Sequence, residues 1–159
     1  MTDAHRTHTY SATIRWTGDR GTGTSGYRDY DRRYDVEVTG KPTIAGSSDP
    51  LYRGDPSRHN PEDLLITAVS ACHMLWYLHL CADAGVIVTA YVDDCTGELA
   101  EAADGSGRMT GITLRPTVTI TAGSDPGRAA ALHADAARMC PIAASMAFPV
   151  RHEPSIIVG

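Results

Sequence analysis

The chain has 159 residues and a net charge of −5 at neutral pH, with 42% hydrophobic and 21% charged residues. This length and composition are ordinary for a globular protein, so we expect a single domain over residues 1–159. The acidic balance argues against nucleic acid and anionic membrane as partners, because both require clustered basic residues.

The N-terminal part of the chain predicts strands joined by turns. Residues 9–16 alternate in polarity like a half-buried strand, and residues 18–26 are a glycine-rich turn. The turn lacks the ending and the following helix of a phosphate loop, so we expect a hairpin. Residues 34–38 and 41–45 predict two further strands. The chain opens without an apolar signal segment, which predicts a cytoplasmic location.

A stretch from Asn60 to Gly85 predicts one long helix. Asn60 is a suitable N-cap and forms a capping box with Asp63, while Gly85 can adopt the left-handed conformation that ends a helix. Between these ends the sequence is apolar nearly all round, which predicts a central helix buried on most sides. His73 and His79 interrupt the apolar residues and argue against a membrane span.

Residues 86–100 and 107–123 predict a pair of antiparallel strands. The first segment is rich in β-branched residues and breaks at Thr96 and Gly97, whereas the second alternates in polarity. Pro116 lies inside the second segment, which predicts a bulge or an edge position, because proline cannot donate a sheet hydrogen bond.

Residues 124–140 predict a second helix, capped by Ser124 or Asp125. Proline follows Cys140 and disfavours helical geometry there, so the helix ends, and a last strand is expected over residues 154–158. This order of elements predicts an α+β fold with antiparallel sheets around the central helix. The inner surface of the second helix is expected to contain Ala130, Leu132, Ala136, Ala137 and Met139.

The chain has four cysteines, Cys72, Cys81, Cys95 and Cys140. Cys72 lies halfway along the long helix, where a free cysteine usually packs as a small apolar residue. Cys140 closes the second helix, a position from which a side chain can face a cavity. Such a pair suits a peroxide reductase, in which one thiolate attacks the O–O bond and the second thiol then forms a disulfide.

No metal and no other cofactor are expected. A mixture of these cysteines with His73, His79 and His133 could bind zinc, but their spacing matches no usual zinc motif.

The segment NPEDLL followed by SAC, and a later Cys-Pro dipeptide, resemble the OsmC-like branch of the OsmC/Ohr superfamily. These are osmotically inducible and organic-hydroperoxide-resistance proteins. The resemblance implies an intertwined homodimer, with its central helices between two sheets and its sites at the subunit interface. It also implies reduction of organic hydroperoxides without a cofactor, using a dithiol reductant such as a lipoyl group.

By position, this resemblance makes Cys72 the peroxidatic cysteine and Cys140 the resolving cysteine. Glu62 matches the glutamate that holds an active-site arginine in this family. Arg53 fits the arginine of the OsmC-like branch and Arg20 that of the Ohr-like branch, and we favour Arg53. A permanently charged guanidinium favours the thiolate that peroxide attack requires.

Glu62 and Cys72 are separated by about 15 Å of helix, at roughly 1.5 Å per residue. If they act in one site, Glu62 and its arginine therefore come from the partner subunit, which predicts an obligate dimer. His73, directly after Cys72, is expected to be a core histidine with its hydrogen bonds satisfied.

The surroundings expected for Cys72 are apolar and consist of Val69, Leu75, Trp76 and Phe148. They favour an organic hydroperoxide over hydrogen peroxide, because burial of an alkyl chain there is favourable. The alternative function is a non-catalytic homodimer that binds an apolar small molecule in the same pocket.

Overall fold

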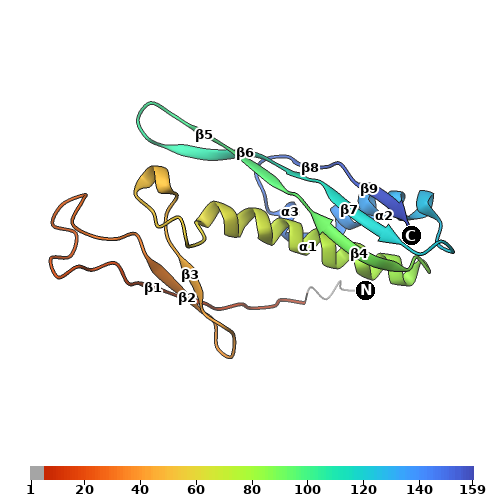
Figure 1. Cartoon of the computed structure of the whole chain (residues 1–159), viewed down its shortest axis with the longest axis horizontal. Helices are drawn as coiled ribbons and strands as arrows, with labels where there is room; N and C mark the ends of the chain where they lie inside the picture. Colours follow the sequence, from red (N-terminus) through yellow and green to blue (C-terminus); the bar gives the residue numbers. More distant parts are fainter. Residues whose placement is uncertain (1–5) are drawn as a thin grey trace. The chain divides into compact units, whose positions relative to one another are not determined.

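The computed structural model describes residues 6–159 of the chain (Figure 1). Backbone contacts divide the chain into two compact units, the first ending at Asp63 and the second running from Leu64 to Gly159. The single domain expected over residues 1–159 stays a prediction.

The first unit contains a three-stranded antiparallel sheet in the order β1-β2-β3. The loop between β1 and β2 contains the glycine-rich turn, and the pairing of these two strands confirms the predicted hairpin. The indole nitrogen of Trp16 donates a hydrogen bond to the carbonyl of Asp31 (2.9 Å) and closes the base of this loop. The strands are β1 (Thr13–Trp16), β2 (Tyr34–Glu37) and β3 (Ile44–Gly46), and a 3-10 turn follows at Pro50–Tyr52.

The long helix α1 (Pro61–Asp83) begins and ends where the sequence predicts. The side-chain oxygen of Asn60 accepts a hydrogen bond from the amide of Asp63 (2.7 Å), and the Asp63 carboxylate accepts one from the amide of Asn60 (3.3 Å). This is the expected capping box. Gly85 has φ of 72°, so it adopts the left-handed conformation expected after the helix.

The buried residues of α1 form one narrow stripe. They are Val69, His73, Tyr77 and Cys81, and their spacing of four places them on the same side of the helix. Leu75, by contrast, exposes 63% of its surface. The helix is therefore less buried than the sequence predicts. By length and composition α1 could also cross a membrane, a test that core helices of soluble proteins pass as well.

The second unit contains two three-stranded sheets, in the orders β4-β7-β9 and β5-β6-β8. β5 and β6 form the predicted antiparallel hairpin, and β4 pairs antiparallel with β7. β8 and β9 join β6 and β7 in parallel, so these sheets are mixed rather than purely antiparallel. The strands are β4 (Val88–Asp93), β5 (Thr96–Glu101), β6 (Gly107–Leu114), β7 (Pro116–Ile120), β8 (Val150–His152) and β9 (Ser155–Val158).

Pro116 marks a change of sheet, and not the predicted bulge or edge. The segment 107–123 is two strands, because β6 ends at Leu114 and β7 begins at Pro116 in the other sheet. Between them the amide of Arg115 donates a hydrogen bond to Asp93 (2.6 Å), which satisfies the backbone at the crossing. The break in residues 86–100 likewise falls after Asp93, before β5 starts, and Gly97 lies inside β5.

Helix α2 (Pro126–Met139) is capped by Asp125, whose side chain accepts hydrogen bonds from two amides of the first turn (2.8 and 3.1 Å). Ser124 instead accepts a hydrogen bond from the amide of Ile87. A short helix that the sequence did not predict, α3 (Pro141–Ala144), follows directly. The buried face of α2 consists of Ala129, Leu132, His133 and Ala136, so the predicted inner surface was wrong for Ala130 and Met139, which are exposed.

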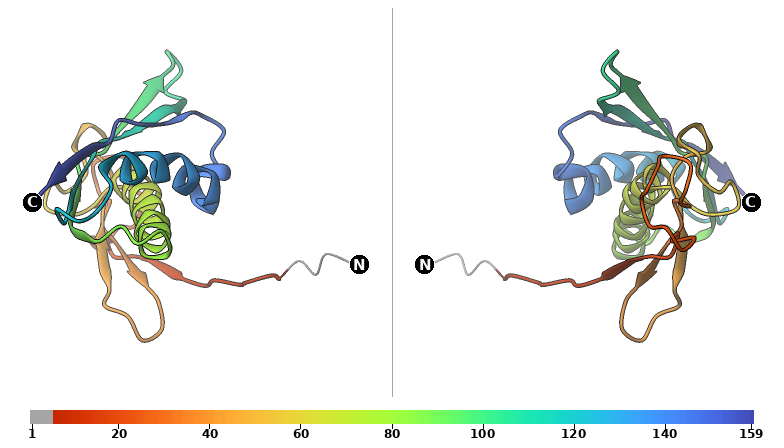
Figure 2. Two further views of the ribbon diagram at one scale, coloured as in Figure 1. Left: turned by 90° about the vertical axis from the view of Figure 1, so that its right-hand side faces the viewer. Right: turned by 90° about the vertical axis from the view of Figure 1, so that its left-hand side faces the viewer.

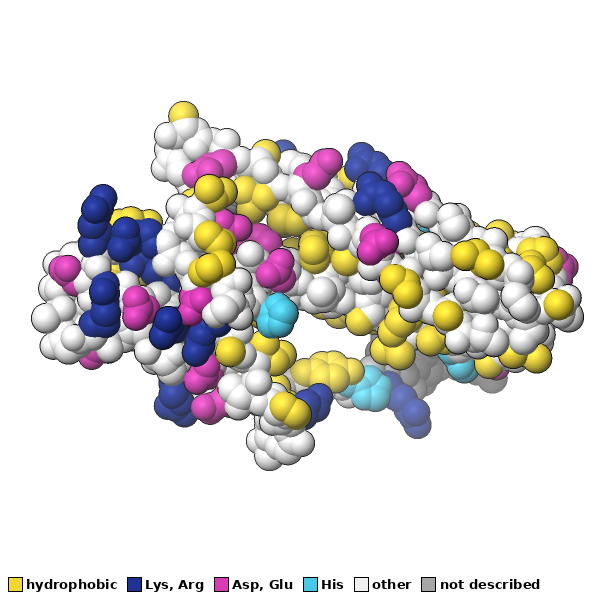
Figure 3. Space-filling model, viewed as in Figure 1, with side chains coloured by type: hydrophobic (Ala, Val, Ile, Leu, Met, Phe, Trp, Pro, Cys, Tyr) yellow, Lys and Arg dark blue, Asp and Glu magenta, His cyan; other side chains and the backbone are white. Residues whose placement is uncertain are grey.

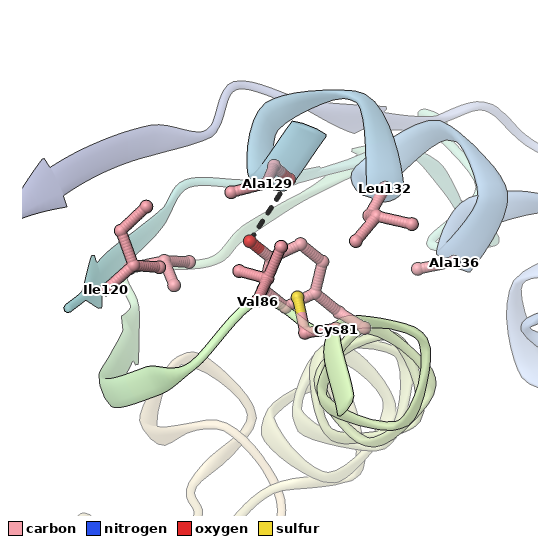
Figure 4. Packing of buried hydrophobic residues seen from close by; sticks show 8 residues of the cluster. Cys81, Val86, Ile120, Ala129, Leu132 and Ala136 are labelled. Atoms are coloured by element: carbon pink, nitrogen blue, oxygen red, sulfur yellow. Dashed lines mark hydrogen bonds between the residues drawn. The ribbon is translucent and has the colours of Figure 1, made fainter. Parts of the chain in front are cut away.

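Helix α2 packs across α1 in the second unit (Figure 2). The larger core cluster lies between these helices and the sheet that contains β7, with Tyr77, Cys81 and Leu132 among its buried members (Figure 4). A second cluster forms around Val69, Ile112 and Leu114, on the sheet that contains β6. The core thus fixes how α1 faces α2.

Candidate functional site

The side chains of Cys72 and Cys140 lie near enough for Cys72 to affect the pKa of the Cys140 thiol. Cys72 is half-buried on α1, whereas Cys140 is fully buried at the junction of α2 and α3. Burial, together with the side-chain hydrogen bond to Cys72, raises the pKa of the Cys140 thiol to about 11. Both cysteines are free thiols. The structure therefore brings the two predicted catalytic cysteines together from helices that are distant in sequence.

The Cys-Pro dipeptide orients the Cys140 side chain. Cys140 is at once the C-cap of α2 and the N-cap of α3, with an extended backbone conformation. Its sulfur accepts a hydrogen bond from the amide of Ala143 (3.4 Å), and Pro141 occupies the first position of α3, where a missing amide hydrogen costs nothing. The sequence break expected here is thus a turn that directs the sulfur into the protein.

A pocket of about 440 Å³, with apolar and polar residues in its lining, borders the cluster that contains Val69, one turn before Cys72 on α1. Its apolar lining is supplied by Met109, Met146 and Phe148, all of which pack against that cluster. Of the surroundings expected for Cys72, Val69 and Phe148 belong to this cluster. Trp76 packs against the other cluster, and Leu75 is exposed.

Arg53 and Arg20 both lie in loops of the first unit. Arg53 follows the 3-10 turn with φ of 65°, and within residues 6–159 it is the one non-glycine residue with positive φ. Such a conformation is costly for a residue with a side chain, and it is found preferentially at functional sites. The Arg53 guanidinium lies 5.9 Å from the centre of the Tyr27 ring. Arg20 lies 3.8 Å from the Asp31 carboxylate.

Glu62 lies in the first turn of α1 and is half-buried. Burial raises the pKa of Tyr34, and the negative charge of Glu62 adds to this effect. In the described part of the chain no ion pair joins Glu62 to either Arg53 or Arg20. The predicted glutamate–arginine pair is therefore not formed within the chain.

Several other arginines of the first unit are held by neighbours of the same unit. Arg32 lies over the rings of Tyr27 and Tyr30, at 4.4 and 4.1 Å from their centres. Arg33 pairs with Asp55 at 3.0 Å. Basic and acidic side chains are interleaved over this unit (Figure 3), as expected of a solvated surface rather than a phosphate site.

Three histidines meet inside the second unit, a feature that sequence reasoning missed. His73 Nε2 and His133 Nδ1 are 3.0 Å apart, and the rings of His73 and His152 have centres 4.5 Å apart. His73 is buried as predicted, but the prediction of satisfied hydrogen bonds was wrong, because its Nδ1 has no partner among residues 6–159. The sequence did contain one sign that His73 is buried, because it lies four residues from both Val69 and Tyr77 and so on the same side of α1.

Among residues 6–159 the cysteines and histidines are not grouped as metal ligands. Searching the described residues for three or more His, Cys, Asp or Glu side chains placed to hold a metal ion finds no such group.

Comparison with known proteins identifies a matching family and several structures with the same fold. The family model described as OsmC-like protein matches residues 54–155. No curated protein sequence matches the chain. Among solved structures, an OsmC-like protein of unknown function from Vibrio cholerae is similar to this chain with a TM-score of 0.83 and 27% identity, covering 93% of this chain and 99% of that one.

Two more distant structures share the fold. The organic hydroperoxide resistance protein OsmC from Legionella pneumophila matches with a TM-score of 0.69 and 19% identity, over 97% of this chain and 100% of that one. The organic hydroperoxide resistance protein OhrB of Bacillus subtilis matches with a TM-score of 0.61 and 18% identity, over 94% and 98%. The family model covers well over half of the length of this chain, so the chain belongs to the OsmC-like protein family.

Proposed function

We propose that this protein is a cytoplasmic, thiol-dependent peroxidase that reduces organic hydroperoxides through Cys72 and Cys140. The observation that carries the proposal is the proximity of these two thiols, which is close enough for Cys72 to raise the pKa of Cys140. Membership of a family whose fold includes organic hydroperoxide resistance proteins supports it.

Exposure and acidity assign the two thiols to different steps. The half-buried Cys72 can be reached by a substrate, whereas Cys140 is completely buried. With a pKa of about 11, Cys140 stays protonated at neutral pH, so it is poorly suited to attack a peroxide first, because the thiolate is the nucleophile. Cys72 is therefore the peroxidatic cysteine in our proposal, and Cys140 the resolving one.

In this proposal hydroperoxide reduction takes place in two steps, formation of a sulfenic acid and then of a disulfide. The Cys72 thiolate attacks the terminal peroxide oxygen, the O–O bond breaks, and the alcohol leaves after taking up a proton, which leaves Cys72 as a sulfenic acid. The Cys140 sulfur then attacks the Cys72 sulfur, a disulfide forms and water leaves with the Cys140 proton. A dithiol reductant, such as dihydrolipoamide, restores both thiols by exchange.

The pocket beside the Val69 cluster suits an alkyl hydroperoxide. Its volume of about 440 Å³ and its lining by Met109, Met146 and Phe148 accommodate an apolar chain, and burial of such a chain contributes roughly 0.8 kcal/mol per methylene group. Hydrogen peroxide gains nothing from this surface. An organic substrate is therefore favoured.

A homodimer would complete the site. The exposed side of α1 carries Leu75, and an open apolar depression lies between Leu75, Trp76 and His79. Exposed apolar surface of this kind usually marks an interface. Glu62 and Arg53 have no ion-pair partner in residues 6–159, so Arg53 can act on the Cys72 of a second copy and Glu62 can hold that arginine in place.

The test is consumption of cumene hydroperoxide with dihydrolipoamide as the reductant. We expect turnover by the wild type, none by Cys72→Ser, and at most a single turnover by Cys140→Ser. Cys95→Ser is the matched control, because Cys95 is also a half-buried thiol of the second unit, and it should keep full activity.

The alternative function gives a different result in the same assay. A non-catalytic dimer that binds an apolar molecule would show no turnover in any variant, and excess hydroperoxide would leave its cysteines unmodified. Mass mapping of a Cys72–Cys140 disulfide after one equivalent of hydroperoxide separates the two functions, since only the peroxidase forms it.

A further inference from the structure

His73 and His133 form a direct hydrogen bond between α1 and α2, with their facing ring nitrogens 3.0 Å apart. Their exposed fractions are 1% and 3%, and their ring planes differ by only 9°. One ring donates through its N–H and the other accepts through its bare nitrogen, so the bond requires at least one neutral ring. A buried polar contact of this kind specifies geometry more than an apolar contact does.

The environment of the two rings keeps them neutral. Burial, and the neighbouring histidines, lower the pKa of His73 to about 3, and burial with the nearby His152 lowers that of His133 to about 4. The negative charge of Asp93 acts on His152, and this carboxylate accepts a hydrogen bond from the Ser70 hydroxyl. The bond between His73 and His133 therefore persists unchanged across the neutral pH range.

Each of the two helices carries one histidine of this bond and one cysteine of the thiol pair. His73 follows Cys72 directly on α1, and His133 lies seven residues before Cys140, about two turns away on the same side of α2. The apolar core and the hydrogen bond from Tyr77 to the carbonyl of Ala129 already hold these helices together, and the histidine bond adds a directional contact about two turns of α2 from Cys140. The histidine bond is thus a polar contact between the two helices whose residue on α1 directly adjoins Cys72.

We propose that His73 and His133 are positioning residues, whose hydrogen bond holds α2 against α1 at the separation that lets Cys72 and Cys140 form a disulfide. The proposal rests on the cysteine pair of the proposed function. A disulfide tolerates Cα separations of only about 4.4 to 6.8 Å. A small displacement of α2 therefore disfavours the bond between the sulfurs.

The experiment measures the equilibrium of the Cys72–Cys140 disulfide in the full-length protein against mixtures of reduced and oxidised dithiothreitol. Oxidised dithiothreitol takes the two electrons and two protons released when the sulfurs join, so no peroxide is needed. The disulfide is quantified by mass mapping after acid quenching. His133→Leu removes the bond, and we expect the equilibrium constant for disulfide formation to fall about three- to tenfold, the usual effect of one neutral hydrogen bond.

Two further variants separate positioning from general damage to the core. The asparagine of His133→Asn places its amide where Nδ1 of the histidine lies, and it should restore the wild-type equilibrium. His133→Gln places its amide one atom further out and should behave like His133→Leu. If His133→Leu does not fold, as judged by thermal unfolding, the Asn and Gln variants decide the question.

His152→Leu is the matched control, because His152 touches His73 from β8 without joining α1 to α2. It should leave the disulfide equilibrium unchanged. Equal equilibria in wild type, His133→Leu and His133→Gln, or an equal fall in His152→Leu, would overturn the positioning role. A wild type that forms the disulfide but consumes no hydroperoxide would refute the peroxidase alone, and a wild type that forms no disulfide would refute both.

Discussion

Tyr77 of α1 stacks on His133 of α2, with ring centres 3.9 Å apart and planes inclined by 14°. Its hydroxyl also donates a hydrogen bond to the carbonyl of Ala129 (3.1 Å), drawn as the dashed line in Figure 4. The helices that bring the two thiols together are thus joined by polar contacts inside an apolar core. These polar contacts make the packing of α1 against α2 specific, and the effect of removing one of them on stability can be measured.

Replacement of Tyr77 by phenylalanine should lower the free energy of unfolding by about 1 kcal/mol, because it leaves the Ala129 carbonyl without this partner. Urea unfolding monitored by circular dichroism measures the change. Tyr91→Phe is the matched control, since the Tyr91 hydroxyl is buried and unpaired within the described chain. That variant should be unchanged or more stable, and equal losses in both variants would contradict the assignment.

The stability of the protein should fall with falling pH between about 6.5 and 4. The pKa of His73 is lowered to about 3 and that of His133 to about 4 in the folded state, whereas an unfolded chain binds the proton at about 6.5. Over this range the unfolded state binds more protons, so the folded state loses about 1.4 kcal/mol per pH unit for each histidine. Above pH 6.5 their contribution is complete.

Urea titrations at pH 7 and pH 5 measure this slope. His133→Leu should reduce the pH dependence of the unfolding free energy by the contribution of one histidine. Val69→Ala changes the same buried stripe of α1 without removing a titratable group, so it should lower stability equally at both pH values. A wild type with no pH dependence in this range would show that the histidines are not buried in neutral form.

The charged variant Leu75→Glu should convert the proposed dimer into monomers. Leu75 is largely exposed in the single chain, and burial of an unpaired carboxylate in an interface is strongly unfavourable. Sedimentation velocity measures the mass, and Leu75→Met, which stays apolar, should remain dimeric. Peroxidase activity should disappear with the dimer, since Glu62 and Arg53 then lack the partner's cysteine. A fully active monomer would exclude a shared site.

Arg53→Gly should abolish peroxidase turnover while the free energy of unfolding rises by about 1 kcal/mol. Arg53 has φ of 65°, a conformation that costs a side-chain-bearing residue roughly 1–2 kcal/mol and costs glycine little. Turnover and urea unfolding are measured on the same preparation. If Arg20→Ala removes turnover and Arg53→Gly does not, Arg20 is the active-site arginine instead.

The elements that depend on neighbours in sequence were predictable. The capping box of Asn60 and Asp63 and the left-handed Gly85 set the limits of α1 through hydrogen bonds made within a few residues. The hairpin of β5 and β6 follows from alternation around a short turn in the same way. Pro116 was misread, because the same missing amide suits a bulge, an edge or a change of sheet, and only strand pairing distinguishes them.

The sequence by itself determined the elements and, through its family motif, the pair of cysteines to examine, because caps, alternation and motif spacing act over short distances along the chain. Only the tertiary structure decided that Cys140 meets Cys72, that His73 bonds to His133, and that much of α1 remains exposed in one chain. Each of these depends on how helices and strands far apart in sequence pack together, and that packing sets burial, hydrogen-bond partners and thiol acidity.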